Sequence, residues 1–322
     1  MTKILSIDGG GIRGIIPAVI LYEIEERTGK PISELFDLIA GTSTGGILAL
    51  GLTKPDSNQK PQYTAEELID LYTNEGGEIF SRSVWHRIRA GNDLIEEKYP
   101  SEGVETVLQR YFGGTHLKEA LTDVFIPSYE IEQRTPWFFR SYAKDPKNEG
   151  EYDFFMKDVA RATSAAPTYF EPAKLDSAGP QGYYALIDGG VFANNPAMCA
   201  YVEARHVYKE ENDILVVSLG TGQVTDRLAY ERAKDWGIAQ WAQPILNVVF
   251  DGVSHTVDFQ LEELLNNASN DRRYYRFQTL LDKAEDALDD AGADNIQALK
   301  VVARELIEEQ EEDLKDLCKQ LS

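Results

Sequence analysis

The chain has 322 residues, of which 43% are hydrophobic and 27% charged, and its formal net charge is −22. This composition is ordinary for a globular protein and provides for a large core, in one α/β domain or two smaller ones. The strong negative charge argues against binding to nucleic acid, and it should repel anionic membranes at long range.

The cysteine content and the hydrophobic pattern bear on location. Cys199 and Cys318 lie far apart in the sequence, so a disulfide framework is not expected. No stretch approaches about 18 uninterrupted apolar residues, and no signal-peptide pattern precedes the first expected strand. We therefore expect a soluble, cytoplasmic protein, with a peripheral location at membranes as the alternative.

The chain begins with a pattern of strand, glycine loop and helix. Residues Ile4 to Ile7 predict a short buried strand, and Ile15 to Arg27 show apolar residues at helical spacing. Between them, Gly9, Gly11 and Gly14 match the dinucleotide-binding spacing. That function requires an acidic residue at the end of the second strand, which is not found, so nucleotide binding is disfavoured. The alternative is that these loop amides bind an oxyanion.

The next segment has the pattern of a nucleophile elbow. An apolar run from Phe36 to Ala40 leads into Gly41-Thr42-Ser43-Thr44-Gly45, and a helix-like run of small and apolar residues follows to Leu52. In such an elbow, a serine lies on a sharp turn between strand and helix, and side chains two residues away would clash. We therefore predict that Ser43 is a nucleophile, with Gly41 and Gly45 required by the turn.

The remaining chain alternates strands and helices up to about residue 222. We expect strands over 124–129, 137–142, 183–187 and 214–218, and helices over 64–72, 154–164 and 196–208. Thr64 and Glu67 form a capping box, and Asn195 precedes Pro196 as a helix cap. Everything after Asp226 is expected to be helical.

One basic and aromatic stretch lies within this acidic chain. Residues Phe80 to Ala90 include Trp85, Arg87 and Arg89. Aromatic and basic side chains of this kind occur at lipid interfaces. The other interpretation, which the composition favours, is a partly exposed helix or loop with a packed tryptophan.

A nucleophilic serine requires a base. The four histidines, His86, His116, His206 and His255, do not follow strands in the way that Ser43 does. Asp188 does, because it ends the strand expected over 183–187, and Gly189 and Gly190 follow it without crowding the carboxylate. We therefore predict Asp188 as the base, although an aspartate in this position could simply bind loop amides.

Several motifs together resemble those of the patatin-like phospholipases. They are Asp8-Gly-Gly-Gly-Ile-Arg-Gly14, Gly41-Thr-Ser-Thr-Gly45, Ala162-Thr-Ser-Ala-Ala-Pro-Thr-Tyr-Phe170, Asp188-Gly-Gly190, Asn194-Asn-Pro196 and Ser218-Leu-Gly-Thr-Gly222. The resemblance spans most of residues 1–222 and weakens after about residue 230. It implies a catalytic domain over 1–230, followed by a helical extension over 231–322 that packs on the same domain.

The resemblance also implies a fold and a mechanism. The expected fold is α/β, a three-layer α/β/α sandwich with a mostly parallel central sheet, with helices added at the C-terminus. Ser43 and Asp188 would form a catalytic dyad that cleaves fatty-acyl esters of phospholipids or galactolipids. The loop of Gly9, Gly10, Gly11, Arg13 and Gly14 would supply the oxyanion hole. No cofactor or metal is expected, and no calcium-loop motif is present.

Two other functions remain open on the same fold. One is a regulated effector phospholipase that a small second messenger activates. The other is a storage-type protein with residual esterase activity. In each case the expected partner is a lipid or a membrane-surface substrate, and the oligomeric state is not predicted.

Overall fold

The computed structural model describes residues 1–79, 101–142, 153–176, 182–209, 211, 213–225, 228–241, 244–266, 272–285 and 287–322. The basic and aromatic stretch with Trp85, Arg87 and Arg89 lies outside these ranges, as does His86. Among the helices that are described, none has both the length and the hydrophobicity needed to cross a lipid bilayer.

One eight-stranded sheet forms the centre of the molecule. Its strands are β1 (Thr2–Ile7), β2 (Leu38–Gly41), β3 (Asp123–Glu130), β4 (Thr135–Arg140), β5 (Ala173–Asp176), β6 (Tyr183–Asp188), β7 (Ile214–Leu219) and β8 (Tyr274–Phe277). The order is β5-β6-β3-β2-β1-β7-β8, and β4 pairs with β3. The run from β3 through β2, β1 and β7 to β8 is parallel, whereas β4, β5 and β6 join by antiparallel pairs.

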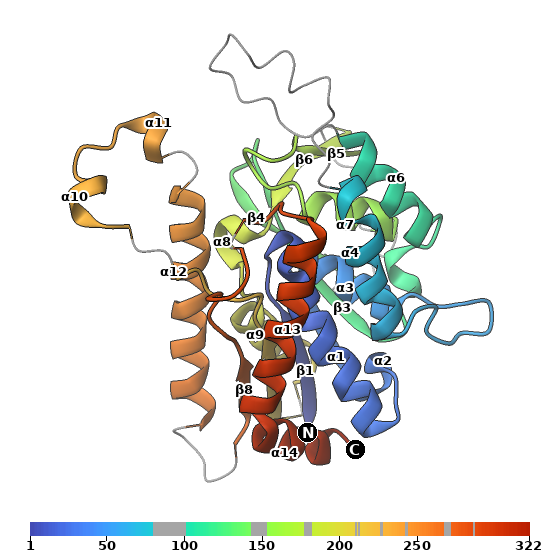
Figure 1. Ribbon diagram of the computed structural model, residues 1–322. Coiled ribbons are helices and arrows are strands. Elements are labelled where there is room, and N and C mark those ends of the chain that lie inside the picture. Colours follow the sequence, from blue (N-terminus) through green and yellow to red (C-terminus); the bar gives the residue numbers. More distant parts are fainter. Residues whose placement is uncertain are drawn as a thin grey trace.

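Helices cover both faces of the sheet (Figure 1). One layer contains α1 (Ile15–Thr28), α2 (Ile32–Leu35), α3 (Thr44–Thr53), α4 (Ala65–Ile79), α6 (Ser101–Phe112), α7 (Met156–Thr163), α13 (Ala293–Glu309) and α14 (Glu311–Leu321). The other contains α9 (Ala197–Val207) and α12 (Pro244–Leu261). Shorter elements are η1 (Gly11–Gly14), η2 (Leu117–Glu119), α8 (Gly190–Ala193), α10 (Tyr230–Ala233), α11 (Ile238–Trp241) and η4 (Glu262–Asn266).

Burial of both faces explains why the central strands are continuously apolar. In β1, Leu5 and Ile7 pack into the larger core, whereas Ile4 packs into the smaller core beneath α9. Successive residues of a strand point to opposite faces, so a strand between two helical layers needs apolar residues at almost every position. The sequence prediction of a mostly parallel, three-layer α/β fold is confirmed.

Local signals located most elements but not all of them. The capping box at the start of α4 is confirmed, because the backbone N–H of Thr64 donates to Glu67 and that of Glu67 donates to the Thr64 hydroxyl. Strand β5 and helices α2, α6 and α8 were not predicted. The expectation that everything after Asp226 is helical is wrong, because β8 pairs with β7 in parallel. The short run of Tyr274, Tyr275 and Phe277 becomes a strand only because β7 offers it a partner.

The packing of β8 and α13 generates a prediction about truncation. Deletion of residues 231–322 would leave β7 as an open edge and would uncover the face of α1 that α13 covers. Exposed strand edges and large apolar patches promote aggregation. We therefore expect the fragment 1–230 to be insoluble or to lack a cooperative thermal transition, as circular dichroism and size-exclusion chromatography would show. A monomeric, cooperatively melting fragment would contradict this expectation.

Candidate active site

Ser43 occupies a strained turn between β2 and α3. Its φ of 55° and ψ of −123° lie outside the regions that residues with side chains normally adopt. The turn is held from behind by Thr163 of α7. The backbone N–H of Ser43 donates to Thr163 Oγ1 at 3.0 Å, and that hydroxyl donates to the carbonyl oxygen of Pro127 at 2.6 Å.

The two glycines of the elbow are required by backbone contacts. A Cβ atom at Gly41 would lie 2.1 Å from the carbonyl oxygen of Gly45, and one at Gly45 would lie 2.2 Å from the carbonyl oxygen of Ile7. Both distances are far below a van der Waals contact, so neither position can carry a side chain. This close approach brings the elbow against the end of β1, where the glycine loop begins.

Asp188 reaches Ser43 through the strand pairing. Strand β3 runs parallel to β2, and β6 runs antiparallel to β3, so that Asp188 lies opposite Ser128. This register places the end of β6 beyond the end of β2. The Asp188 carboxylate is buried, accepts a hydrogen bond from the backbone N–H of Gly190 at 2.7 Å, and is hydrogen-bonded to the Ser43 side chain. Gly189 passes so close to the carbonyl oxygen of Pro127 that a Cβ there would lie at 2.5 Å.

Burial dominates the electrostatics of Asp188. The loss of solvent raises the pKa of its carboxyl to about 7, and the hydrogen bonds from Gly190 and Ser43 offset only part of that rise. A carboxyl with such a pKa can both hold and release a proton near neutral pH.

The glycine loop presents two backbone amides beside Ser43. The carbonyl oxygen of Gly9 accepts from Thr221 Oγ1 at 2.8 Å, and that of Gly10 accepts from Arg13 Nε at 3.3 Å. In a trans peptide the C=O and the next N–H point in opposite directions, so these contacts direct the amides of Gly10 and Gly11 away from Thr221 and Arg13. Within the described part of the chain, neither amide has an acceptor.

The predicted loop residues divide into two groups. Gly10 and Gly11 line the same cavity as Ser43 and Asp188. Gly9, Arg13 and Gly14 lie behind them and support the loop, and a Cβ at Gly14 would lie 2.3 Å from the hydroxyl of Thr44.

An apolar cavity extends from these residues into the larger core. Its walls come from α3, α4, α6, the turn after α7, and α12. The apolar side chains that line it include Ile47, Leu71, Ile79, Val104, Phe170 and Phe250.

The sequence of this chain matches a known family over more than half of its length. The model of the patatin-like phospholipases matches residues 5–201. The chain belongs to the patatin-like phospholipases. It is 34% identical to a Solanum tuberosum protein named probable inactive patatin-3-Kuras 1, over 95% of this chain and 86% of that one. It is 32% identical to patatin-like protein 4 of Arabidopsis thaliana, over 96% and 84% of the two chains. It is also 32% identical to patatin-T5 of Solanum tuberosum, over 100% and 90%.

Membership of this family supports the function of a lipid acyl hydrolase. The three described histidines lie away from the Ser43 cavity. His116 lies 3.0 Å from the carboxylate of Asp153, His206 is exposed on α9, and His255 hydrogen-bonds Gln223 at 2.8 Å. None of these three lines the cavity of Ser43.

Sequence reasoning assigned no role to three residues that support this patatin-like site. Thr163 holds the elbow, and Thr221 and Asn194 both contact the carbonyl oxygen of Gly9. All three lie within motifs quoted for the family resemblance. Their positions in those motifs were the only available signal, because hydroxyl and amide side chains are common in loops.

The raised pKa of Asp188 generates a prediction about stability. Between about pH 4 and pH 7 the folded protein retains a proton that the unfolded chain has released, so ionisation of Asp188 lowers stability as the pH rises. Asp188→Asn removes this cost, which is of the order of 4 kcal/mol for a buried group with this shift. We expect the variant to melt at a higher temperature than the wild type at pH 8 and at a similar temperature below pH 4.

The exposed Asp70 of α4 provides the control, since Asp70→Asn should change the melting temperature little at either pH. A lower melting temperature for Asp188→Asn at pH 8 would contradict the assignment of a buried, costly carboxylate.

Proposed function

We propose that this protein hydrolyses fatty-acyl esters of phospholipids or galactolipids, with Ser43 as nucleophile and Asp188 as its base. The observation that carries the proposal is a buried carboxylate hydrogen-bonded to a serine in a strained elbow, at an apolar cavity. A strained turn that exposes a serine is typical of acyl-transfer enzymes. Of the described residues that line the cavity, none is a histidine, and this favours a dyad over a triad.

In the first step, Ser43 Oγ attacks the ester carbonyl carbon, and its proton passes to Asp188. The carbonyl oxygen becomes an oxyanion, which the amides of Gly10 and Gly11 would bind. A donor of this kind typically contributes about 3–4 kcal/mol to transition-state stabilisation. Protonated Asp188 then gives its proton to the leaving alcohol or lysolipid, which departs and leaves an acyl group on Ser43.

In the second step, Asp188 removes a proton from a water molecule that attacks the acyl-enzyme. The fatty acid departs, and Ser43 regains its proton. A carboxylate with an ordinary pKa would be a poor base for this chemistry. The pKa of about 7 that burial gives Asp188 supports the role, because general-base catalysis is most effective when the pKa lies near the working pH.

The cavity supports a long apolar substrate. Ile47, Leu71 and Phe170 present only hydrocarbon surface to the space behind Ser43. Each methylene group that moves from water into such a site contributes about 0.8 kcal/mol to the free energy of binding. A fatty-acyl chain fits this lining better than a polar acyl group does.

One relative is named a probable inactive patatin, so family membership alone does not decide activity. The present chain has serine at the elbow and aspartate at the end of β6; Ser43 is half-buried, Asp188 is buried, and both line the same cavity. We also propose that residues 1–230 form the catalytic domain and that residues 231–322 pack on it as part of the same folded unit.

The dyad generates a kinetic prediction. Ser43→Ala should abolish hydrolysis of a soluble short-chain ester, because alanine fits the elbow but provides no nucleophile. Asp188→Asn should lose nearly as much, because an amide cannot accept the proton. The alanine variants of all four histidines should each retain turnover within about tenfold of the wild type: His86→Ala, His116→Ala, His206→Ala and His255→Ala.

A soluble ester avoids any effect of membrane binding, and melting temperatures identify variants that are inactive because they unfold. A folded but inactive histidine variant, together with an active Asp188→Asn enzyme, would overturn the dyad. Activity near the wild-type level in Ser43→Ala would overturn the nucleophile.

The cavity generates a prediction about chain length. Val104 of α6 lines the cavity and is buried. Val104→Phe should exclude about two methylene groups of a long acyl chain from the cavity. At about 0.8 kcal/mol for each methylene group, this should lower kcat/KM for the long-chain ester roughly tenfold. The ratio of kcat/KM for a sixteen-carbon ester to that for a four-carbon ester should fall by about this factor. Val301→Phe, an equal change on the exposed face of α13, is the matched control and should leave the ratio unchanged.

A further inference from the structure

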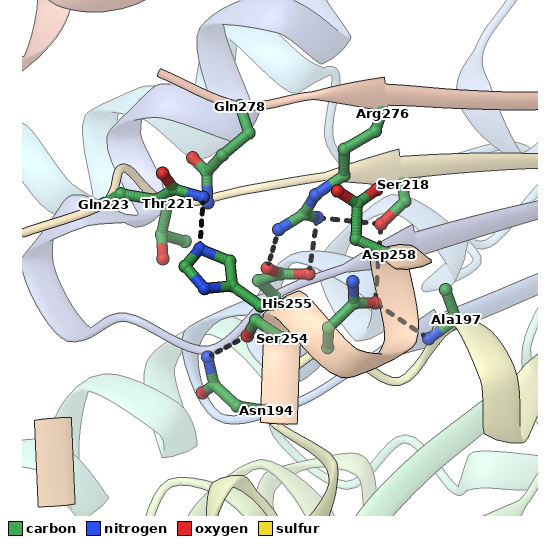
Figure 2. A network of polar contacts seen from close by, with 12 residues as sticks. Asn194, Ala197, Ser218, Thr221, Gln223, Ser254, His255, Asp258, Arg276 and Gln278 are labelled. Atoms are coloured by element: carbon green, nitrogen blue, oxygen red, sulfur yellow. Dashed lines mark hydrogen bonds and ion pairs between the residues drawn. The ribbon is translucent and has the colours of Figure 1, made fainter. Parts of the chain in front are cut away.

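A buried ion pair connects the glycine loop to the C-terminal part of the chain. Arg276 of β8 donates to the Asp8 carboxylate from both terminal guanidinium nitrogens, Nη1 to Oδ1 at 3.0 Å and Nη2 to Oδ2 at 2.6 Å. Arg276 Nη1 also donates to Ser218 Oγ of β7 at 2.8 Å. Figure 2 shows Arg276 extending past Ser218 beside helix α12. Asp8 belongs to the motif of the glycine loop, yet the proposed chemistry gives it no part.

The strand register explains how Arg276 reaches Asp8. Arg276 lies opposite Ser218 in the pairing of β8 with β7, and Ser218 lies opposite Ser6 in the pairing of β7 with β1. Asp8 follows Ser6 by two residues, so the two side chains emerge on the same face of the sheet. The arginine therefore crosses β7 to contact the first residue after β1.

Asp8 immediately precedes the residues that would form the oxyanion hole. The backbone N–H of Asp8 donates to the carbonyl oxygen of Leu219 at 2.9 Å, which holds its backbone. Arg276 additionally holds the Asp8 side chain. At the other end of the loop, the N–H of Ile12 donates to the carbonyl oxygen of Leu288 at 2.9 Å. The C-terminal segment thus holds the loop on both sides of Gly10 and Gly11.

The energetics of the pair indicate a positioning function. The side chains of Asp8 and Arg276 are 2% and 11% exposed, so both charges have been removed from water. A buried ion pair is often no more stable than well-packed apolar residues, whereas loss of one partner leaves a costly buried charge. An arginine that contacts a carboxylate through two hydrogen bonds fixes the orientation of the two side chains relative to one another.

We infer that Arg276 is a positioning residue that holds the glycine loop, through Asp8, in the geometry that binds the oxyanion. This inference rests on the proposed function, because it assigns Gly10 and Gly11 to the oxyanion hole. Arg276 lies outside residues 5–201, the part that the family model matches. The C-terminal extension would therefore contribute to catalysis as well as to folding.

The test compares Arg276→Met with a control at a neighbouring arginine. Arg273 also pairs with an aspartate, Asp213 at 2.6 Å, but the aspartate side chain is 48% exposed and the pair lies away from the glycine loop. For Arg276→Met we expect kcat on a soluble ester to fall about 10- to 100-fold, approaching the loss of one oxyanion donor. KM should stay within about threefold, because the interaction is made mainly in the transition state. Arg273→Met should keep kcat near the wild-type value.

Binding of two inhibitors separates positioning from general damage. A trifluoromethyl ketone of the substrate's chain length forms a tetrahedral adduct with a serine, and its oxyanion occupies the hole. Its affinity should fall by about the same factor as kcat/KM, whereas the affinity of the free fatty acid should not change. An equal loss for both inhibitors, or no loss for either, would overturn the inference.

Two further variants test the same inference if Arg276→Met fails to fold. Arg276→Lys keeps the charge but cannot make both contacts, so we expect it to fold and to lose about tenfold in kcat. Asp8→Asn combined with Arg276→Met removes both buried charges, and we expect it to recover the melting temperature but not kcat. Recovery of kcat in the double variant would assign the pair a purely structural function. An active Ser43→Ala enzyme would instead refute the proposed function itself.

Discussion

The contact between the elbow and the end of β1 is the constraint on which the site depends. Gly45 lies so close to the carbonyl oxygen of Ile7 that no Cβ fits between them. This contact fixes where α3 begins, and hence where Ser43 lies relative to the loop that starts at Asp8. A side chain at Gly45 would separate these two turns, and one at Gly41 would clash with the backbone of Gly45 within the elbow. The parallel pairing of β1 with β2 then brings both turns to the same edge of the sheet.

Burial of Asp188 is the second constraint, and it opposes stability while it suits the base that we propose Asp188 to be. The carboxyl lies within the protein with hydrogen bonds from Gly190 and Ser43 and no cationic partner among them. This environment raises the pKa and makes ionisation costly. In the mechanism that we propose, the same rise would allow an aspartate to act where a histidine would otherwise be needed. A site of this kind requires a rigid scaffold, which the two helical layers and their cores provide.

The C-terminal part of the chain completes the structure in three ways. Strand β8 covers the edge of β7, α13 packs against α1, and Phe250 of α12 lines the cavity. Of these contacts, that of Phe250 places a residue from beyond the matched family region directly against the Ser43 site. The acidic helices α13 and α14 are therefore integrated with the α/β core, and their charge lies on the outward faces.

Local sequence patterns were sufficient to predict the elbow, the glycine loop and the position of Asp188 at the end of β6. Gly41 and Gly45 are required by backbone geometry that any such turn must have, so their spacing around Ser43 can be read directly. The central strands were equally clear, because burial on both faces requires the continuous apolar runs seen in β1 and β7. Strand β8 was missed because four residues carry little local signal, and their pairing with β7 depends on partners 58 residues away.

What the sequence by itself determined is the fold class, the family and the set of candidate site residues. The tertiary structure alone decided how these residues meet. The register of β3 with β6 brings Asp188 to Ser43, and Thr163 holds the elbow from a different helix. The contact of Arg276 with Asp8 could not be predicted, because it joins residues 268 positions apart. Such contacts depend on the order of strands in the sheet, and no local pattern of residues encodes that order.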